Sequence, residues 1–438
     1  MKKNSLPLPF KLLLGIVIGA ILGLFCRSNV AGTAGLMQLF VCLHGLMGQF
    51  IMFCVPLIVL GFIMPSITRL GDNAGRLLGV ALLLAYVSSV LAATMSTIIG
   101  YAVVPAIKDL IARPEKATEL PTAIFQLPIP QIMPVITALF LSITMGLAVV
   151  WTKAHTWKAL LLEFQAMVLS IVEKCVIPIL PFYIGTTFVN LGYEGTLSQF
   201  PVFIIAILIV LIGHFIWMAL LYGIAGAYSK KNPVEVFKYY GPAYITAVGT
   251  MSSAATLSVA LECARKSKVL RKDLVNFGIP LFANIHLCGS VLTETFFVMI
   301  ISQILYGKLP ELMTMILFII LLGIFAIGAP GVPGGTVVAS LGLVTGILGF
   351  DETGAALVLA IFALQDSFGT ACNVTSDGAL TLFLTGYAEK HNIVEMIERK
   401  VEDATSLAGS YAVKAGSVAV KATKKVTGAV KKAVKRKK

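Results

Sequence analysis

Apolar stretches long enough to cross a lipid bilayer recur along this entire chain. Its 438 residues are 58% hydrophobic and only 13% charged, and the mean hydropathy is +0.92. A soluble domain of this length would carry about twice that share of charged residues. In hydrocarbon, backbone amides must find partners within the protein, and a helix satisfies them within one segment. The sequence therefore predicts an all-α membrane protein.

Eight of these stretches are predicted to be transmembrane helices. Several exceed the shortest crossing length, so we expect tilted helices. The first is expected to be a transmembrane helix rather than a signal peptide, because no clear small-residue cleavage site follows Phe25. The predicted spans are about 10–28, 36–68, 75–106, 131–152, 157–192, 199–228, 272–305 and 353–389.

Two further apolar regions, about 234–267 and 310–349, are interrupted at their centres by small residues. The interruptions read Gly-Thr-Met-Ser-Ser-Ala-Ala-Thr at 249–256 and Gly-Ala-Pro-Gly-Val-Pro-Gly-Gly-Thr at 328–336. Such turns cannot face lipid, because their backbone groups would lack partners. We therefore expect two re-entrant helical hairpins, whose tip amides can bind an anion at helix N-termini.

The positive charges favour a cytoplasmic N-terminus. With eight spans and two hairpins that return to the side they leave, fourteen Lys and Arg residues before the tail lie inside and five outside. An even number of spans places the C-terminus inside as well. We expect a multi-pass protein of the plasma membrane with both termini in the cytoplasm.

The basic tail, 395–438, carries ten basic residues and no acidic residue from Lys414 to Lys438. Its repeated Ala, Val, Lys and Gly fit equally well a weak amphipathic helix at an anionic leaflet and a solvated, disordered segment. The tail holds no aromatic or base-reading motif, so nucleic acid is not an expected partner.

The last predicted span carries a polar stripe. Asp366, Thr370, Asn373 and Asp377 are spaced by four, three and four residues and share one face of a helix. A seam that only joins helices would not require two acidic residues, and burying an ionised group in hydrocarbon costs several kcal/mol. We expect the stripe to line a site enclosed by protein.

No catalytic or metal-binding motif stands out. The seven cysteines are scattered without a CxxC pair and are expected to act as small buried apolar side chains. The chain has no nucleotide-binding loop and no Ser-His-Asp order. We do not expect an enzyme, a disulfide framework or a zinc site.

Three features together resemble the glutamate/aspartate transporter family, the dicarboxylate/amino-acid:cation symporters. They are the serine-rich first tip, the Gly-Val-Pro-Gly second tip at 331–334, and the Asp, Thr, Asn and Asp of the last span. The likeness covers nearly all of 1–390 and is strongest from 240 to 385. The basic tail lies outside the family pattern.

The resemblance implies a homotrimer with two kinds of domain. Scaffold segments 1–70 and 131–198 form the fixed trimerisation part. A transport domain, made of 75–106 and 199–389, carries the substrate across the membrane like an elevator, and the second hairpin acts as its gate.

The resemblance also assigns substrate contacts. Asp366 matches the aspartate that binds the substrate's amino group, and a buried carboxylate suits an ammonium. Asn373 and the first-tip residues Ser252 and Ser253 match the groups that hold the α-carboxylate, which tip amides suit as well. The other predicted substrate-binding residues are Gly331, Val332, Pro333, Gly334, Gly369 and Thr370.

Two departures from the family concern the substrate's side chain. Members that take acidic substrates carry an arginine three residues after the amine-binding aspartate, or in the first tip, where this chain has Gly369 and Met251. No arginine occurs from 273 to 398, although a second carboxylate calls for a guanidinium. A small neutral amino acid is therefore expected, and Leu-Gln-Asp-Ser at 364–367 looks like the serine/threonine branch. Because Gly369 opens space, a bulkier neutral substrate such as cystine stays open.

The predicted cation site also departs from sodium-coupled relatives. These carry Asn-Met-Asp-Gly-Thr in span seven, where this chain reads His-Leu-Cys-Gly-Ser at 286–290. Neither His286 nor Cys288 supplies the hard oxygen ligand that sodium prefers. A bound sodium remains the second candidate, because oxygen ligands survive at Ser88, Ser89, Asn373 and Asp377.

A proton is the favoured coupling ion. Glu294 aligns with a position that holds glutamate in proton-coupled relatives, and burial favours the protonated form of a carboxyl group. His286 lies two helical turns earlier and is expected to complete a His–Glu proton site. The alternative is a neutral histidine that replaces the coordination of a lost ion.

The sequence thus predicts a secondary active symporter of a small neutral amino acid, coupled to a cation and without a cofactor. Its expected partners are the substrate, the coupling cation, the lipid bilayer and further copies of the chain in a homotrimer. Three alternatives stay open: a symporter of acidic amino acids or dicarboxylates, a substrate-gated anion channel, and a sensor that binds substrate without transporting it. Saturable flux and exchange against substrate on the far side would separate a transporter from a channel.

Overall fold

All regular elements in the described part of the chain are helical, as predicted. The computed structural model describes residues 8–28, 33–70, 76–107, 118–195, 197, 200–329, 331 and 333–393. The helices are α1 (Leu8–Arg27), α2 (Thr33–Leu70), α3 (Arg76–Val103), α4 (Val135–Thr152), α5 (His155–Ile171), the π-helical turn η2 (Val172–Val176), α6 (Ile177–Glu194), α7 (Phe200–Ser229), α8 (Val234–Phe237), α9 (Gly241–Thr250), α10 (Ser253–Arg265), α11 (Lys272–Ile285), α12 (Cys288–Tyr306), α13 (Leu312–Gly328), α14 (Gly335–Gly346) and α15 (Glu352–Lys390).

Eight helical segments among the described residues are long and apolar enough to cross a membrane, which confirms the eight predicted spans. The fourth begins at Val135 rather than near 131, because Pro134, which lacks an amide hydrogen, is extended and takes the N-cap position. The segments are Phe10–Arg27, Thr33–Thr68, Arg76–Ile107, Val135–Thr152, His155–Glu194, Pro201–Ser229, Lys272–Tyr306 and Glu352–Lys390.

Each predicted hairpin contains two helices that pack against each other, α9 with α10 and α13 with α14. Met251 turns the chain between α9 and α10 with a left-handed backbone, at φ 53°. Gly334 has φ 70° directly before α14, a conformation that glycine adopts without the steric cost that a side chain brings. Re-entry of the two hairpins into a membrane stays a prediction.

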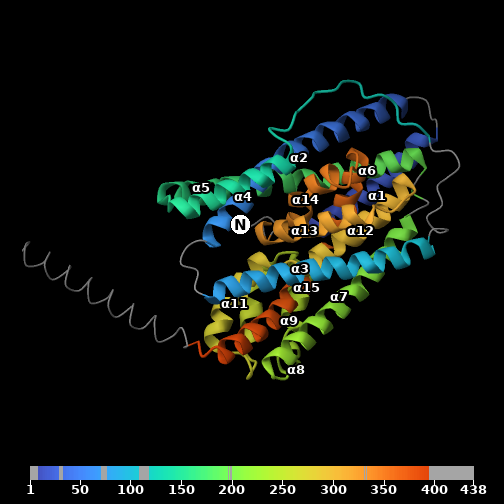
Figure 1. Cartoon of the computed structure of the whole chain (residues 1–438). Helices are drawn as coiled ribbons and strands as arrows, with labels where there is room; N and C mark the ends of the chain where they lie inside the picture. The colour runs from blue at the N-terminus through green and yellow to red at the C-terminus, as the bar shows by residue number, and fades with distance from the viewer. Residues whose placement is uncertain are drawn as a thin grey trace, which may run out of the picture. The chain divides into compact units, whose positions relative to one another are not determined.

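Contacts between helices fall into two groups within residues 1–387. In the first group α2 contacts α1, α4, α5 and α6, and in the second α3 contacts α7, α11, α12 and α13. The groups meet where α13 and α14 contact α2 and where α14 contacts α4. Figure 1 shows α2, α4 and α5 on one side, α3 and α7 on the other, and α12, α13 and α14 between them.

Glycines let α1 and α6 approach each other backbone to backbone. A Cβ built at Gly19 would overlap the carbonyl oxygen of Gly185, and a Cβ at Gly15 would lie 2.5 Å from the carbonyl oxygen of Pro181. Helices in membranes associate through such small residues, because van der Waals contact replaces the hydrophobic driving force available in water. The pair therefore depends on positions where even a methyl group does not fit.

Replacing Gly19 with alanine is expected to lower the free energy of unfolding by about 1–3 kcal/mol, because the new methyl group must push α1 away from α6. Thermal denaturation of the purified protein in detergent would measure this loss. Gly45→Ala is the matched control, since nothing lies within 4 Å of a Cβ at that position. Equal melting temperatures for the two variants would contradict the close packing of α1 and α6.

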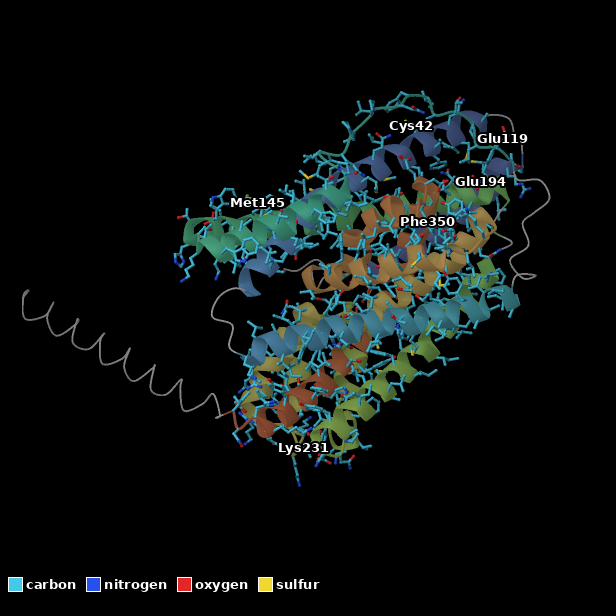
Figure 2. All side chains as sticks on the ribbon, in the orientation of Figure 1. Cys42, Glu119, Met145, Glu194, Lys231 and Phe350 are labelled. Atoms are coloured by element: carbon cyan, nitrogen blue, oxygen red, sulfur yellow. The ribbon has the colours of Figure 1, made fainter. Side chains whose placement is uncertain are left out.

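The connection before α4 lies at the same end of the helices as the end of α6. Thr118 donates its backbone amide hydrogen to the carbonyl oxygen of Glu194 at 3.1 Å. Figure 2 shows Glu119 and Glu194 at this end and Lys231, which follows α7, at the other. This arrangement is consistent with loops on opposite sides of a membrane, although the orientation stays a prediction. The basic tail, 395–438, lies outside the described residues.

Candidate functional site

The polar stripe of the last span lies on α15, which runs as one helix from Glu352 to Lys390. The side chains of Asp366, Thr370, Asn373 and Asp377 are each at most 4% exposed. In the most apolar window of this helix, 89% of the residues are buried inside the protein. The stripe therefore faces other protein elements and not lipid.

Asp366 accepts hydrogen bonds from two neutral donors. The amide of Gly334 donates to Oδ2 at 2.8 Å, and the hydroxyl of Thr370 donates to Oδ1 at 3.4 Å. Gly334 stands directly before α14, so its amide belongs to the second hairpin tip. Among the described residues, no positively charged side chain pairs with Asp366. The carboxylate is therefore available to a cationic group of a ligand.

The two hairpin tips touch each other. The hydroxyl of Ser252 donates to the carbonyl oxygen of Gly331 at 2.7 Å. The hydroxyl oxygen of Ser252 also accepts from the amide of Ala255 at 3.2 Å, so Ser252 caps the N-terminus of α10. Ser253, the first residue of α10, is buried. The structure thus joins the first tip to the second, while the second tip binds Asp366 through Gly334.

Asn373 ties α15 to the break between α11 and α12. Its Oδ1 accepts from the amides of Gly289 at 2.7 Å and Ser290 at 3.3 Å, and its Nδ2 donates to Ser290 Oγ at 2.9 Å. Both amides lie in the first turn of α12, where a helix leaves donors without partners. Asn373 therefore caps a neighbouring helix, a role that the sequence does not reveal. Its contact with a substrate carboxylate stays a prediction.

His286 bridges α3 and α15 from the break before α12. Its Nδ1 lies 2.9 Å from Asp377 Oδ1, and its Nε2 lies 2.8 Å from Ser88 Oγ. The expected pair of His286 with Glu294 is therefore wrong, since both ring nitrogens have other partners. That expectation required one continuous helix, but the backbone is extended at His286, with φ −119° and ψ 103°, and α11 ends there.

Glu294 contacts the second hairpin instead. The hydroxyl of Ser340 on α14 donates to Glu294 Oε1, and Oε2 has no partner among the described residues. Both side chains are fully buried. Ser340 is not among the predicted site residues, although a hydroxyl group in an apolar helix was an available signal.

Four other predicted residues have different surroundings. A Cβ at Gly369 would lie 3.6 Å from the backbone of Gly289, so this position faces α12 and not the open space that the sequence suggests. Ser89 is buried, and its hydroxyl has no partner among the described residues. Pro333 is half-buried, and Val332 lies outside the described residues.

A second buried histidine, His214 on α7, joins the same region without having been predicted as a site residue. Its Nε2 lies 3.0 Å from both Gly289 O and Thr293 Oγ1, and Thr293 donates to Gln365 Oε1 at 2.9 Å. These groups link α7, α12 and α15. Thr293 directly precedes Glu294 in the sequence, and Gln365 directly precedes Asp366. An imidazole inside an apolar span is the signal that could have found it.

Three relatives share part of this sequence. The serine/threonine transporter SstT of Acinetobacter baylyi is 32% identical over 202 residues, 44% of this chain and 48% of that protein. Excitatory amino acid transporter 3 of Homo sapiens is 29% identical over 190 residues, 42% of this chain and 34% of its own. Excitatory amino acid transporter 2 of Mus musculus is 29% identical over 227 residues, which are 50% of this chain and 39% of that protein. The matched segments thus span less than half the length of each relative.

A family model covers far more of the chain than these pairwise matches. Residues 8–386 match the model of the sodium:dicarboxylate symporter family, from the start of α1 almost to the end of α15. The family and the relatives are transporters, which confirms the prediction that the protein is not an enzyme. Because this match covers most of the chain, this protein belongs to the sodium:dicarboxylate symporter family.

Proposed function

We propose that this protein is a secondary active symporter that carries a small neutral amino acid across the plasma membrane by an elevator motion, coupled to a proton. The observation that carries the proposal is the buried carboxylate of Asp366, which has neutral donors and no cationic partner among the described residues. A carboxylate in this environment is stabilised by an ammonium group. An α-amino acid supplies that ammonium together with a carboxylate for the hairpin tips.

The absence of arginine in the sequence around the site supports a neutral substrate. A carboxylate side chain of the substrate would need a bidentate partner, and residues 273 to 398 contain no arginine. Gly369 faces the backbone of α12, so a bulky substrate gains no room on that side. The relative from Acinetobacter baylyi is a serine/threonine transporter, which supports substrates of similar size and charge.

The contact pattern supports an elevator. The first group of helices, with α1, α2, α4, α5 and α6, coincides with the predicted scaffold, and the second group falls within the predicted transport domain. Hairpin helices α13 and α14 contact α2 while the tip before α14 binds Asp366. A hairpin in this position can release substrate only when it moves, as a gate does. By the family resemblance, the scaffold would assemble as a homotrimer with both termini in the cytoplasm.

Reconstitution in liposomes tests the function directly. Uptake of radiolabelled serine, threonine, alanine, cystine, aspartate and glutamate would be measured under an inward proton gradient, an inward sodium gradient or neither. We expect saturable uptake of a small neutral amino acid that the proton gradient drives and that trans substrate accelerates. Transport of aspartate in preference to serine would contradict the neutral substrate, and ion flux without saturable uptake would favour a channel.

Glu294 is the proposed proton carrier, because its side chain is fully buried and Ser340 is its one hydrogen-bond partner among the described residues. No cationic side chain pairs with Glu294 among the described residues. Because Glu294 contacts α14, loss or gain of its proton would affect the second hairpin, which is the proposed gate. A proton gradient of one pH unit supplies about 1.4 kcal/mol for each proton carried.

Replacing Glu294 with glutamine is expected to abolish the rise in uptake on acidifying the outside, while exchange of substrate across the membrane persists. The amide keeps the hydrogen bond with Ser340 but cannot load a proton. Initial uptake rates at a series of external pH values would show this. Glu311→Gln, at an exposed position before α13, is the matched control and should retain the full pH dependence. Unchanged pH dependence in Glu294→Gln would remove Glu294 as the carrier.

A further inference from the structure

Three buried polar groups from separate elements meet at the break between α11 and α12. Asp377 comes from α15, Ser88 from α3, and His286 from the break itself. The imidazole stands between the other two, with 2.9 Å from Nδ1 to Asp377 Oδ1 and 2.8 Å from Nε2 to Ser88 Oγ. All three side chains are at most 4% exposed.

Without the imidazole, this place would suit a hard cation. A buried carboxylate needs a positive partner, and an interrupted helix beside hydroxyl groups offers the oxygen ligands that hard cations take. The name of the family implies sodium as that cation. The residues present do not fit it, because the ring of His286 already contacts one oxygen from α15 and one from α3, Asp377 Oδ1 and Ser88 Oγ.

The remaining donors do not restore a sodium site. Asp377 Oδ2 and Ser89 Oγ are buried without partners among the described residues. A hard cation of this kind takes about six oxygen ligands, so these two side-chain oxygens alone are too few. The neighbouring Cys288 supplies a soft sulfur atom.

We propose that the side chain of His286 occupies the place of the coupling sodium and excludes that ion from the space between Ser88 and Asp377. The ring fills the position in either protonation state, because Nδ1 and Nε2 lie within hydrogen-bond distance of Asp377 Oδ1 and Ser88 Oγ. It also joins α3 to α15 permanently, as a bound cation would do only while present. The proposal rests on the proposed function only in calling this position a coupling site.

Sodium binding can be tested without transport. The melting temperature of the purified protein would be measured in sodium chloride and in choline chloride at equal concentration. We expect no difference for the natural sequence. The double variant His286→Asn with Cys288→Asp supplies oxygen ligands in place of the ring and the thiol. It should melt about 2 °C or more higher in sodium than in choline, because a ligand that binds the folded state stabilises it.

Two controls separate sodium binding from general destabilisation. His214→Asn removes the other buried imidazole of this region, which does not contact Asp377, and should stay insensitive to sodium. Adding Asp377→Asn to the double variant should remove the gained sodium effect. If the double variant cannot be purified, His286→Asn alone is measured in the same way, and it should gain a smaller sodium effect.

Either of two results would overturn the proposal. One is stabilisation of the natural protein by sodium that Asp377→Asn removes, since the ion would then bind despite the ring. The other is a folded His286→Asn variant, alone or with Cys288→Asp, that stays as insensitive to sodium as the natural protein. Neither depends on uptake, so absence of amino-acid transport under every gradient would refute the proposed function and leave this comparison intact.

Discussion

Asp366→Asn is expected to weaken amino-acid binding about 100-fold or more, which corresponds to about 3 kcal/mol. The amide is nearly the same size. Its oxygen can accept from Gly334 and its NH2 group can donate to the hydroxyl of Thr370, but it carries no charge for the substrate's ammonium. Isothermal titration with the substrate found in the uptake screen would measure the loss. The variant should fold, since removing an uncompensated buried charge relieves the cost of burying it.

The matched control is Asp351→Asn at the exposed residue before α15. Asp351 accepts from the amide of Gly354 at 2.8 Å, a contact that asparagine also makes, and it lies outside the polar stripe. Binding should therefore stay within about twofold of the natural protein, as for surface substitutions in general. Undiminished affinity of Asp366→Asn would show that the substrate carries no ammonium at this position, and the proposed substrate class would fall with it.

Asn373→Ala is expected to lower the free energy of unfolding by about 3 kcal/mol or more. The change leaves two amides at the start of α12, those of Gly289 and Ser290, buried without their acceptor, and each such group costs about 1–3 kcal/mol. It also removes the donor to Ser290 Oγ. Thermal denaturation would show a lower melting temperature even in the absence of substrate.

Asn284→Ala provides the comparison for that result. Asn284 is exposed on α11 and donates to the carbonyl oxygen of Pro280 within its own helix, so its loss leaves no buried donor unpaired. Its melting temperature should stay close to that of the natural protein. If Asn373→Ala melted at the same temperature while losing only substrate affinity, the cap on α12 would not matter for stability and Asn373 would be a substrate ligand alone.

The helical framework was predictable because hydropathy reports directly on burial in lipid. The eight spans followed from runs such as 199–228, and the structure moves most of their ends by only a few residues. The start of α4 was misplaced because residues 131–134 are apolar enough to extend the run, while the geometry of Pro134 starts the helix later. The two helix pairs were predictable because small residues interrupt their apolar regions, and a turn needs such residues where a continuous span does not.

The candidate site was predictable only where its members share one helix. Asp366 and Asp377 lie on the same face of α15 because α15 is one continuous helix, so the helical period applies over the whole span. The pairing of His286 could not be read in this way, because the break at 286–287 releases it from the periodicity of α11 and α12. Which partner it meets depends on how α3 and α15 pack against that break.

By itself, the sequence determined the number of membrane-length helices, the two hairpins and the polar face of α15, because each depends on hydropathy or on spacing within one segment. Only the tertiary structure decided that Asp366 meets the second hairpin tip, that Asn373 caps α12, and that His286 joins Asp377 to Ser88. These contacts join residues far apart in the chain. Their geometry is set by the packing of whole helices, which no local pattern records.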